Sequence, residues 1–332
     1  MVILDLVRSI GALADGDSAQ IPIQSRADLE VAQRWADRTA NTVIGTTVDD
    51  SGVGTVEVRR GRPPDPALTL GRDRLPGARL WLYTNFHCNL ACDYCCVGSA
   101  PTVPRRELGA ERIARLVAQG AQWGVGEIYL TGGEPMLLAD IGQIVGHCAA
   151  QLPTTLLTNG MLFQGRRLRA LQAMPRNNFA LQISLDSATP PVHDSHRGAG
   201  SWTKAVEGIR IARAEGFRIR VAATIAAPAP DDISQLHGFL DDLGIPRSDQ
   251  VVRPVAREGV AESGVQLTRE TLVPEVTVTA DGVYWHPVAA TDQQALVTTE
   301  LEPLGPTLDH ISSLFTAQWA AASAAVALFP CA

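Results

Sequence analysis

The sequence predicts an α/β protein built around a parallel sheet, with a smaller α/β unit before it and a short α+β segment after it. Between residues 80 and 255, segments in which apolar and polar residues alternate, as in strands, are separated by segments of helical periodicity. Residues 63–79, which precede them, are rich in proline and glycine and are typical of a linker. After Pro254 the alternation of strand and helix stops. These observations divide the 332 residues into domains of ordinary size.

The first 62 residues predict a small α/β domain. Helical spacing and strand-like alternation succeed one another here within short distances. The expected helices span residues 4–13 and 27–40, and the expected strands span residues 19–24, 42–48 and 55–60.

The central segment, residues 80–255, predicts six successive strand–helix repeats. The expected strands cover residues 80–86, 127–130, 154–157, 180–185, 218–225 and 250–253, and the clearest helices cover 110–122, 201–215 and 233–243. Parallel strands joined by right-handed crossovers close into a barrel or part of one. We therefore expect a partial (β/α)6 TIM-like barrel, with its reactive groups at the carboxyl ends of the strands.

Composition excludes some classes of protein. Lys and Arg number 28 against 35 Asp and Glu, and the resulting net charge of −7 argues against nucleic-acid binding. The longest apolar run, residues 319–329, is shorter than the roughly 20 residues that cross a bilayer. Asp5 near the start and the lack of a basic segment there do not fit a secretory signal. We expect a cytoplasmic protein with no membrane partner.

Four of the six cysteines lie within nine residues, directly after the first barrel strand. Cys88, Cys92 and Cys95 form a CxxxCxxC pattern, and such clustering indicates a metal rather than a disulfide framework. Three thiolates can hold three corners of a [4Fe–4S] cluster and leave one iron open. By spacing alone, a zinc site with a borrowed fourth ligand and plain core cysteines are alternatives. Cys96 directly follows Cys95, which would already ligate one iron of such a cluster, so we interpret Cys96 as a packing residue.

Polar motifs follow the next strands. Gly132 and Gly133 let the backbone approach a neighbour closely, and the Glu134 carboxylate can accept hydrogen bonds from an ammonium group. Alternation turns Ser184 and Asp186 to one side, where both can bind hydroxyl groups, although Asp186 could instead cap the next helix. The motifs are TGGEP at residues 131–135, LTNG at 157–160, QISLD at 182–186 and HDSHRG at 193–198.

The cysteine loop and these motifs, in this order, resemble the radical S-adenosylmethionine (SAM) superfamily over about residues 80–255. The resemblance implies a [4Fe–4S] cluster on Cys88, Cys92 and Cys95 whose open iron is chelated by the amino and carboxylate groups of SAM. It implies that an electron from flavodoxin or ferredoxin then splits SAM into methionine and a 5′-deoxyadenosyl radical, which abstracts hydrogen from a substrate.

The resemblance also implies roles for single residues. It assigns the amino group of SAM to Gly132, Gly133 and Glu134, its ribose to Ser184 and Asp186, and its carboxylate to Arg197. It further places the backbone at Tyr94 and the side chain of Thr224 beside adenine, and turns Asn159 toward SAM or the substrate.

The C-terminal segment, residues 256–332, departs from the superfamily pattern. We expect a hairpin over 275–287 turning at Asp281-Gly282, then a helix over 308–327, forming a lid in which an auxiliary cluster site has degenerated. His286 stands where relatives carry a cysteine; it either packs in the lid or joins Cys331, Cys96 or Cys148 in a mixed metal site.

Two further residues are candidates for contact with the substrate. Cys331 could return a hydrogen atom to a substrate radical, the alternative being a tail cysteine without function. Arg253 ends the sixth strand and could meet an acidic substrate, the alternative being a surface arginine.

The N-terminal domain has a glycine–acid turn at Asp15-Gly16-Asp17, then a strand and an acidic helix that contains Trp35. In these features it resembles the TusA-like sulfur carriers, which form a small β-α-β-α-β-β unit. No cysteine precedes Cys88, so the persulfide chemistry of those carriers is excluded, and docking of a partner or substrate is the expected role. We predict a radical SAM enzyme acting on a small-molecule or cofactor-biosynthetic substrate, molybdopterin-related in the broad sense. The alternatives are a maturase of a ribosomally made peptide, whose leader binds residues 1–62, and a non-catalytic iron–sulfur or zinc protein.

Overall fold

The computed structural model describes residues 2–61, 65–226 and 230–328. The chain forms two compact units: one comprises the residues up to Arg72 together with those from Ser313 onward, and the other comprises Asp73–Ser312. Each unit has its own sheet. Cys331 lies outside the described residues.

The first unit packs two helices against a three-stranded antiparallel sheet of order β1-β3-β2. Its described order is α-β-α-β-β, so the strand that opens the TusA-like pattern has no counterpart in residues 2–61, and that resemblance stays a prediction. Ser25 caps the second helix by accepting a hydrogen bond from the Asp28 amide at 3.2 Å. The elements are α1 (Val2–Gly11), β1 (Ser18–Ile23), α2 (Arg26–Arg38), β2 (Thr42–Val48) and β3 (Gly54–Arg59).

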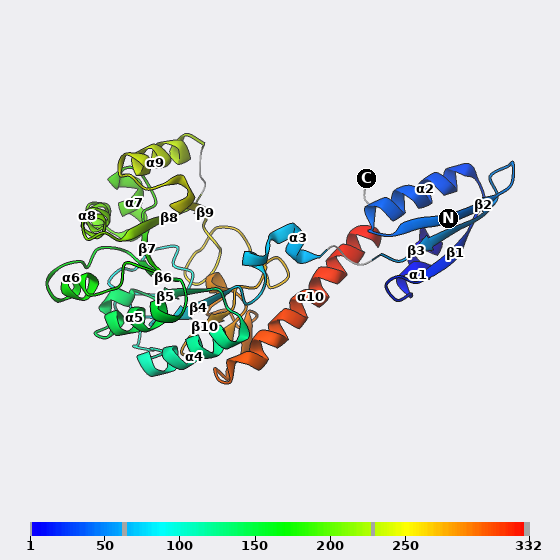
Figure 1. Cartoon of the computed structure of the whole chain (residues 1–332). Coiled ribbons are helices and arrows are strands. Elements are labelled where there is room, and N and C mark those ends of the chain that lie inside the picture. The colour runs from blue at the N-terminus through cyan, green and yellow to red at the C-terminus, as the bar shows by residue number, and fades with distance from the viewer. Residues whose placement is uncertain (1, 62–64, 227–229, 329–332) are drawn as a thin grey trace. The chain divides into compact units, whose positions relative to one another are not determined.

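The second unit contains the six parallel strands that the sequence predicts, in the order β4-β5-β6-β7-β8-β9, and they form an open sheet (Figure 1). The predicted partial barrel is thus confirmed as a sheet that does not close. The strands are β4 (Arg79–Tyr83), β5 (Glu127–Thr131), β6 (Thr154–Thr158), β7 (Phe179–Ser184), β8 (Arg218–Ile225) and β9 (Gln250–Pro254).

Helices connect these strands and lie outside them in Figure 1. On α4, Ile113, Leu116, Val117 and Gly120 are buried, a spacing of three and four residues that turns one face to the sheet. Gly120 packs closely there, because a Cβ atom would lie 3.2 Å from the Leu80 side chain. The helices between the strands are α4 (Ala110–Trp123), α5 (Ile141–Gln151), α6 (Gly165–Gln172), α7 (Pro190–Arg197), α8 (Ser201–Ala214) and α9 (Pro230–Asp242), while the short helix α3 (Pro66–Leu70) belongs to the first unit.

The segment predicted to be a lid extends the sheet beyond β4. Its first strand, β10 (Thr277–Val278), pairs in parallel with Trp81 and Leu82 of β4. Strands β11 (Val283–Tyr284) and β12 (Leu296–Thr298) follow in antiparallel pairing, so the predicted hairpin is present. Helix α10 (Leu304–Leu328) ends the described chain. Among the described helices, none combines the length and the apolar character that a membrane crossing requires.

Candidate active site

A cavity of about 330 Å³ lies at the carboxyl ends of the parallel strands. It is lined by groups from the loop after β4 and from the ends of β5, β6, β7, β8 and β9, so segments far apart in sequence share one wall. The predicted site residues that line it are Cys88, Cys92, Tyr94, Cys95, Gly132, Gly133, Asn159, Ser184, Arg197, Thr224 and Arg253. Glu134 and Asp186 do not line it and lie behind its wall.

The three motif cysteines face this cavity from a single loop. Backbone amides donate hydrogen bonds to two of the sulfurs: Leu90 to Cys88 Sγ at 3.4 Å, and Ser99 to Cys95 Sγ at 3.2 Å. Such bonds stabilise thiolates that ligate iron. The buried Ser99 hydroxyl, also on the cavity wall, has no hydrogen-bond partner in the described part of the chain. A sulfur-rich donor set with a spare polar group beside it fits an iron–sulfur cluster.

The cysteines do not form a site for a single ion. Among residues 2–61, 65–226 and 230–328, no three His, Cys, Asp or Glu side chains lie close enough together to hold one metal ion. A cluster needs only one thiolate per iron, so its ligands stand apart. A zinc site with three such side chains as ligands therefore has no counterpart in this part of the chain, while the mixed site of His286 with Cys331, Cys96 or Cys148 stays a prediction. Burial raises the pKa of Cys88 to about 12 and that of Cys92 to about 11, so free thiols here carry their protons.

Gly132 and Gly133 allow the turn after β5 to lie against the segment that leads into the cysteine loop. A Cβ atom on Gly133 would lie 2.2 Å from the carbonyl oxygen of His87, and one on Gly132 would lie 2.4 Å from Asn85 Oδ1. The Gly133 amide donates to the Asn85 carbonyl at 2.9 Å. The close approach predicted from these glycines is thus made to the chain itself, while both residues also line the cavity.

The Glu134 carboxylate is fully buried and already occupied. It accepts hydrogen bonds from the Thr158 hydroxyl at 2.7 Å, the Asn159 amide at 2.8 Å and the Met136 amide at 2.9 Å. Burial raises the pKa of Glu134, although these donors oppose the shift. The side chain therefore ties the end of β5 to the end of β6; its binding of an ammonium group stays a prediction.

Asp186 is the centre of a second buried network. Its carboxylate accepts two hydrogen bonds from Arg197, at 2.6 Å from Nε and 3.1 Å from Nη2, one from the Thr224 amide at 2.9 Å and one from the Tyr94 hydroxyl. Burial alone raises the pKa of Asp186, but the Arg197 charge and hydrogen bonds outweigh it and the pKa is lowered. Asp186 thus joins the cysteine loop, α7 and β8; ribose binding by this carboxylate stays a prediction.

His193 supports this network as a neutral side chain. Its Nδ1 accepts a hydrogen bond from the Asp186 amide at 3.1 Å, and burial lowers the pKa of His193 to about 4. His196, three residues later, instead pairs with Asp93 at 2.9 Å on the outside. Both histidines therefore bind α7 to neighbouring segments, His193 to the end of β7 and His196 to the cysteine loop.

Asn159 and Arg253 are two further polar residues of the wall. The Asn159 side chain donates from Nδ2 to Asn89 Oδ1 at 2.9 Å, which links the end of β6 to the cysteine loop. Arg253 donates from Nε to the Thr224 hydroxyl at 3.2 Å, and no carboxylate of the described residues lies within ion-pair distance of it.

The C-terminal segment adds the wall residue Glu275, which the sequence did not predict, and His286, which was expected to pack or to ligate a metal. Glu275 lines the cavity and accepts a hydrogen bond from the indole N–H of Trp81, an inward residue of β4. His286 also lines it, and its Nδ1 accepts from the Val288 amide at 3.3 Å, which leaves the Nε2–H as a donor. Only the pairing of β10 with β4 brings this segment to the site, and no local pattern signals that pairing. Trp81 and Tyr83 could have been found from the alternation along β4.

Comparison with known proteins matches residues 82–243 to the model of the radical SAM superfamily. An AdoMet-dependent heme synthase of Methanosarcina barkeri is 28% identical over 159 residues, 47% of this chain and 45% of the relative. Molybdenum cofactor biosynthesis protein 1 of Drosophila melanogaster is 34% identical over 44% of this chain and 26% of its own length. The PqqA peptide cyclase of Ruegeria pomeroyi is 30% identical over 48% of this chain and 43% of its own length. The chain thus spans less than half the length of these relatives.

Solved structures show the same fold. The structure of anSMEcpe with bound AdoMet matches 71% of this chain and 82% of its own, with a TM-score of 0.56 at 13% identity. Streptococcus suis SuiB bound to S-adenosylmethionine matches 59% of this chain and 45% of its own, with a TM-score of 0.50 at 20% identity. Residues 82–243 thus match the radical SAM superfamily, whose enzymes use a [4Fe–4S] cluster and SAM, and the solved structures show the same fold for this part of the chain.

Proposed function

We propose that this protein is a radical SAM enzyme that reductively cleaves S-adenosylmethionine and uses the 5′-deoxyadenosyl radical to abstract hydrogen from a small-molecule or cofactor-biosynthetic substrate. The observation that carries the proposal is the shared cavity: three cysteines of one loop and the polar ends of five further strands line the same space of about 330 Å³. Relatives named for heme and molybdenum cofactor biosynthesis support the substrate class, with chemistry related to molybdopterin in the broad sense.

In this proposal Cys88, Cys92 and Cys95 hold the cluster. A [4Fe–4S] cluster with three thiolate ligands supplies an open iron and one electron for splitting a sulfonium. The protein contributes a cavity whose wall groups orient SAM and the substrate relative to the cluster.

The SAM-binding wall consists of groups that face the cavity, supported from behind by Glu134 and Asp186. Asp186 fixes the Arg197 guanidinium and leaves its other N–H groups for the carboxylate of SAM. The wall groups assigned to SAM are Tyr94, Gly132, Gly133, Asn159, Ser184, Arg197 and Thr224.

Arg253 is assigned to the substrate. Its guanidinium lines the cavity at the end of β9 and has no carboxylate partner among the described residues, unlike Arg197. A charged donor without a partner favours a ligand that carries a carboxylate or phosphate. His286, a neutral donor on the same wall, adds a second contact for such an acceptor.

Anaerobic reconstitution with iron and sulfide, followed by SAM and dithionite, tests the proposal. An enzyme of this kind forms 5′-deoxyadenosine and methionine, whereas a non-catalytic iron–sulfur protein binds the cluster and yields neither product. Cys92→Ala should abolish both iron binding and cleavage. Cys148→Ala is the matched control, because Cys148 is buried on α5 away from the cavity.

A peptide maturase is the second candidate. Relatives named PqqA peptide cyclase and mycofactocin maturase are 30% and 32% identical to this chain over less than half its length. If the substrate is a peptide, the N-terminal unit is the proposed binding site for its leader. Titration of the full chain with candidate leader peptides separates the two proposals, since a small-molecule enzyme has no affinity for them.

Cys331 keeps its proposed role as a hydrogen-atom donor to a substrate radical. Cys331→Ala should then stop turnover after hydrogen abstraction, so that 5′-deoxyadenosine still forms while the product does not. Unchanged product formation would exclude the role.

A further inference from the structure

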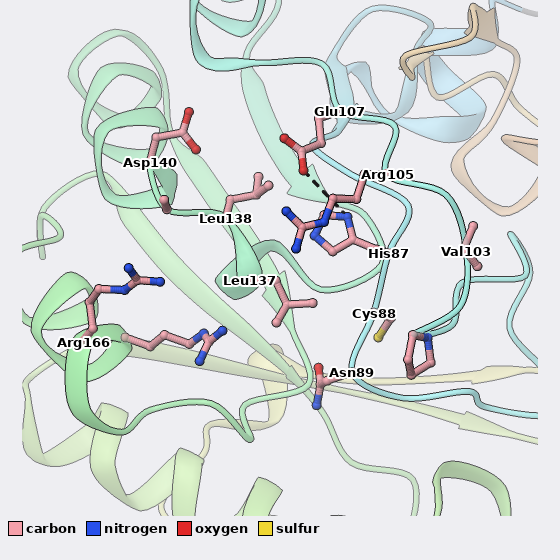
Figure 2. A pocket seen from close by; sticks show the side chains of 13 residues that line it. His87, Cys88, Asn89, Val103, Arg105, Glu107, Leu137, Leu138, Asp140 and Arg166 are labelled. Carbon is pink, nitrogen blue, oxygen red and sulfur yellow. Dashed lines mark ion pairs between the residues drawn. The ribbon is translucent and has the colours of Figure 1, made fainter.

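A second hollow, of about 830 Å³, shares the lining residue Cys88 with the cavity. Cys88 lines both spaces, so one proposed cluster ligand is in contact with each of them. Figure 2 shows Cys88 and Asn89 on one segment of this hollow, and Arg105 and Arg166 on two others. Neither arginine has an ion-pair partner among the described residues. We name this space the arginine hollow; it is lined by His87, Cys88, Asn89, Pro101, Val103, Arg105, Glu107, Leu137, Leu138, Ala139, Asp140, Arg166 and Arg167.

A third space, of about 600 Å³, also reaches a cluster cysteine, in this case Cys92. Its ionisable lining consists of Asp93, Glu262, Tyr94 and His196 besides that cysteine, and it contains no Arg or Lys. The arginine hollow carries three arginines against Glu107 and Asp140. The two approaches to the cluster loop are therefore opposite in charge.

We propose that the arginine hollow is the docking site of an acidic one-electron carrier protein of the flavodoxin class. The proposal rests on the proposed function, because it requires a cluster on Cys88. Electron transfer weakens steeply with distance, so a carrier must dock where little protein separates it from the cluster, and Cys88 is at that point. In each transfer the carrier is oxidised by one electron and the cluster is reduced by one.

The surroundings fit such a partner. The chain has a net charge of −7, so an acidic protein is repelled by much of its surface and steered toward a local group of arginines. Apolar side chains of Val103, Leu137 and Leu138 lie among the charged ones, as at transient protein interfaces. The exposed charges of the hollow are Arg105, Arg166 and Glu107, and Glu107 lies 3.8 Å from His87, so the arginines outnumber the one exposed carboxylate.

The test is charge reversal in the reconstituted full chain. The double variant Arg105→Glu/Arg166→Glu should bind reduced flavodoxin at least about tenfold more weakly by titration calorimetry, and the rate of cluster reduction by flavodoxin should fall equally, because both carrier and rim are then acidic. Affinity of the parent chain should fall as salt is raised. Glu262→Arg, in the third space, is the control and should not weaken binding.

Dithionite separates failure of this proposal from failure of the proposed function. SAM cleavage with dithionite should be the same in parent and double variant, since a small reductant needs no docking site. Unchanged flavodoxin affinity in the double variant, or a loss that appears with Glu262→Arg alone, would overturn the docking site. A parent chain that binds a cluster and cleaves no SAM with dithionite would overturn the proposed function instead.

Discussion

Two buried carboxylates, Glu134 after β5 and Asp186 after β7, occupy similar places in the sheet and are held in different ways. Glu134 accepts only from uncharged groups, two amides and a hydroxyl, and its pKa is raised. Asp186 accepts from a guanidinium as well, and its pKa is lowered. The difference shows that burial penalises a carboxylate unless an opposite charge compensates it.

The comparison also separates two layers of the site. Glycines, hydroxyls and arginines face the cavity, whereas the two carboxylates hold those groups from behind. Motif residues can therefore be required for the site without touching a ligand.

The largest expected effect comes from removing the charge that compensates Asp186. Arg197→Met should lower the free energy of unfolding by about 3–5 kcal/mol, because it leaves a buried carboxylate without its partner. Urea denaturation measures this loss. Arg253→Met is the matched control and should change stability by less than about 0.5 kcal/mol, since no carboxylate depends on it. Equal losses in the two variants would show that the pair does not stabilise the fold.

A methyl group added to Gly133, the residue before Glu134, should destabilise the fold by steric overlap. Gly133→Ala should cost about 1–3 kcal/mol of stability, because the new methyl group would overlap the His87 carbonyl. Gly146→Ala on α5 meets no atom within 4 Å and should instead stabilise by up to about 1 kcal/mol, since alanine favours a helix. Thermal unfolding of both variants checks the contrast, and a neutral Gly133→Ala would contradict the close packing of this turn.

Replacing Glu134, whose hydrogen-bond donors are all uncharged, should cost less stability than breaking the Arg197–Asp186 ion pair. Glu134→Gln should cost about 1–2 kcal/mol, because an amide NH₂ group would face one of the backbone or hydroxyl donors that now meet a carboxylate oxygen. Chemical denaturation measures the loss. A cost equal to that of Arg197→Met would remove the distinction between the two networks.

The smallest and most specific effect is the pH dependence. Because the folded pKa of Glu134 lies above its ordinary value of 4.5, the Glu134 contribution to stability is fully present below 4.5 and is lost as pH rises through the folded pKa. Because the folded pKa of Asp186 lies below 3.8, its contribution is present above 3.8 and is lost as pH falls through the folded pKa.

The stability deficits of two variants relative to the parent should therefore change in opposite directions. The deficit of Glu134→Gln should shrink as pH rises toward neutrality, and that of Asp186→Asn should shrink only in strong acid. Urea unfolding across this range measures both, and parallel profiles would show that the two carboxylates share one environment.

Much of the fold was predictable because its signals are local. The alternation along β8 fixed the strand at Arg218–Ile225, and the glycines and prolines around it marked its ends. Parallel strands expose their carboxyl ends at one edge, so Cys88, Gly132, Asn159 and Ser184 could be expected to meet, and they line one cavity.

The place of the C-terminal segment was not predictable in the same way. Predicted as a lid, it contributes β10 to the sheet beside β4 and thereby brings Glu275 and His286 to the cavity. The two strands are almost two hundred residues apart in sequence, as the Trp81–Glu275 hydrogen bond shows with its separation of 194. A two-residue strand carries too little periodicity to reveal its partner.

The sequence by itself determined the order of the strands, the cysteine loop and the identity of the polar groups at the strand ends, because hydrophobic period and turn residues act over a few positions. Only the tertiary structure decided which of those groups face the cavity and which support it. That choice depends on partners from other strands: Thr158 and Asn159 for Glu134, and Arg197 and Thr224 for Asp186. A buried carboxylate lies where its donors converge, and donors from distant segments converge only in the folded chain.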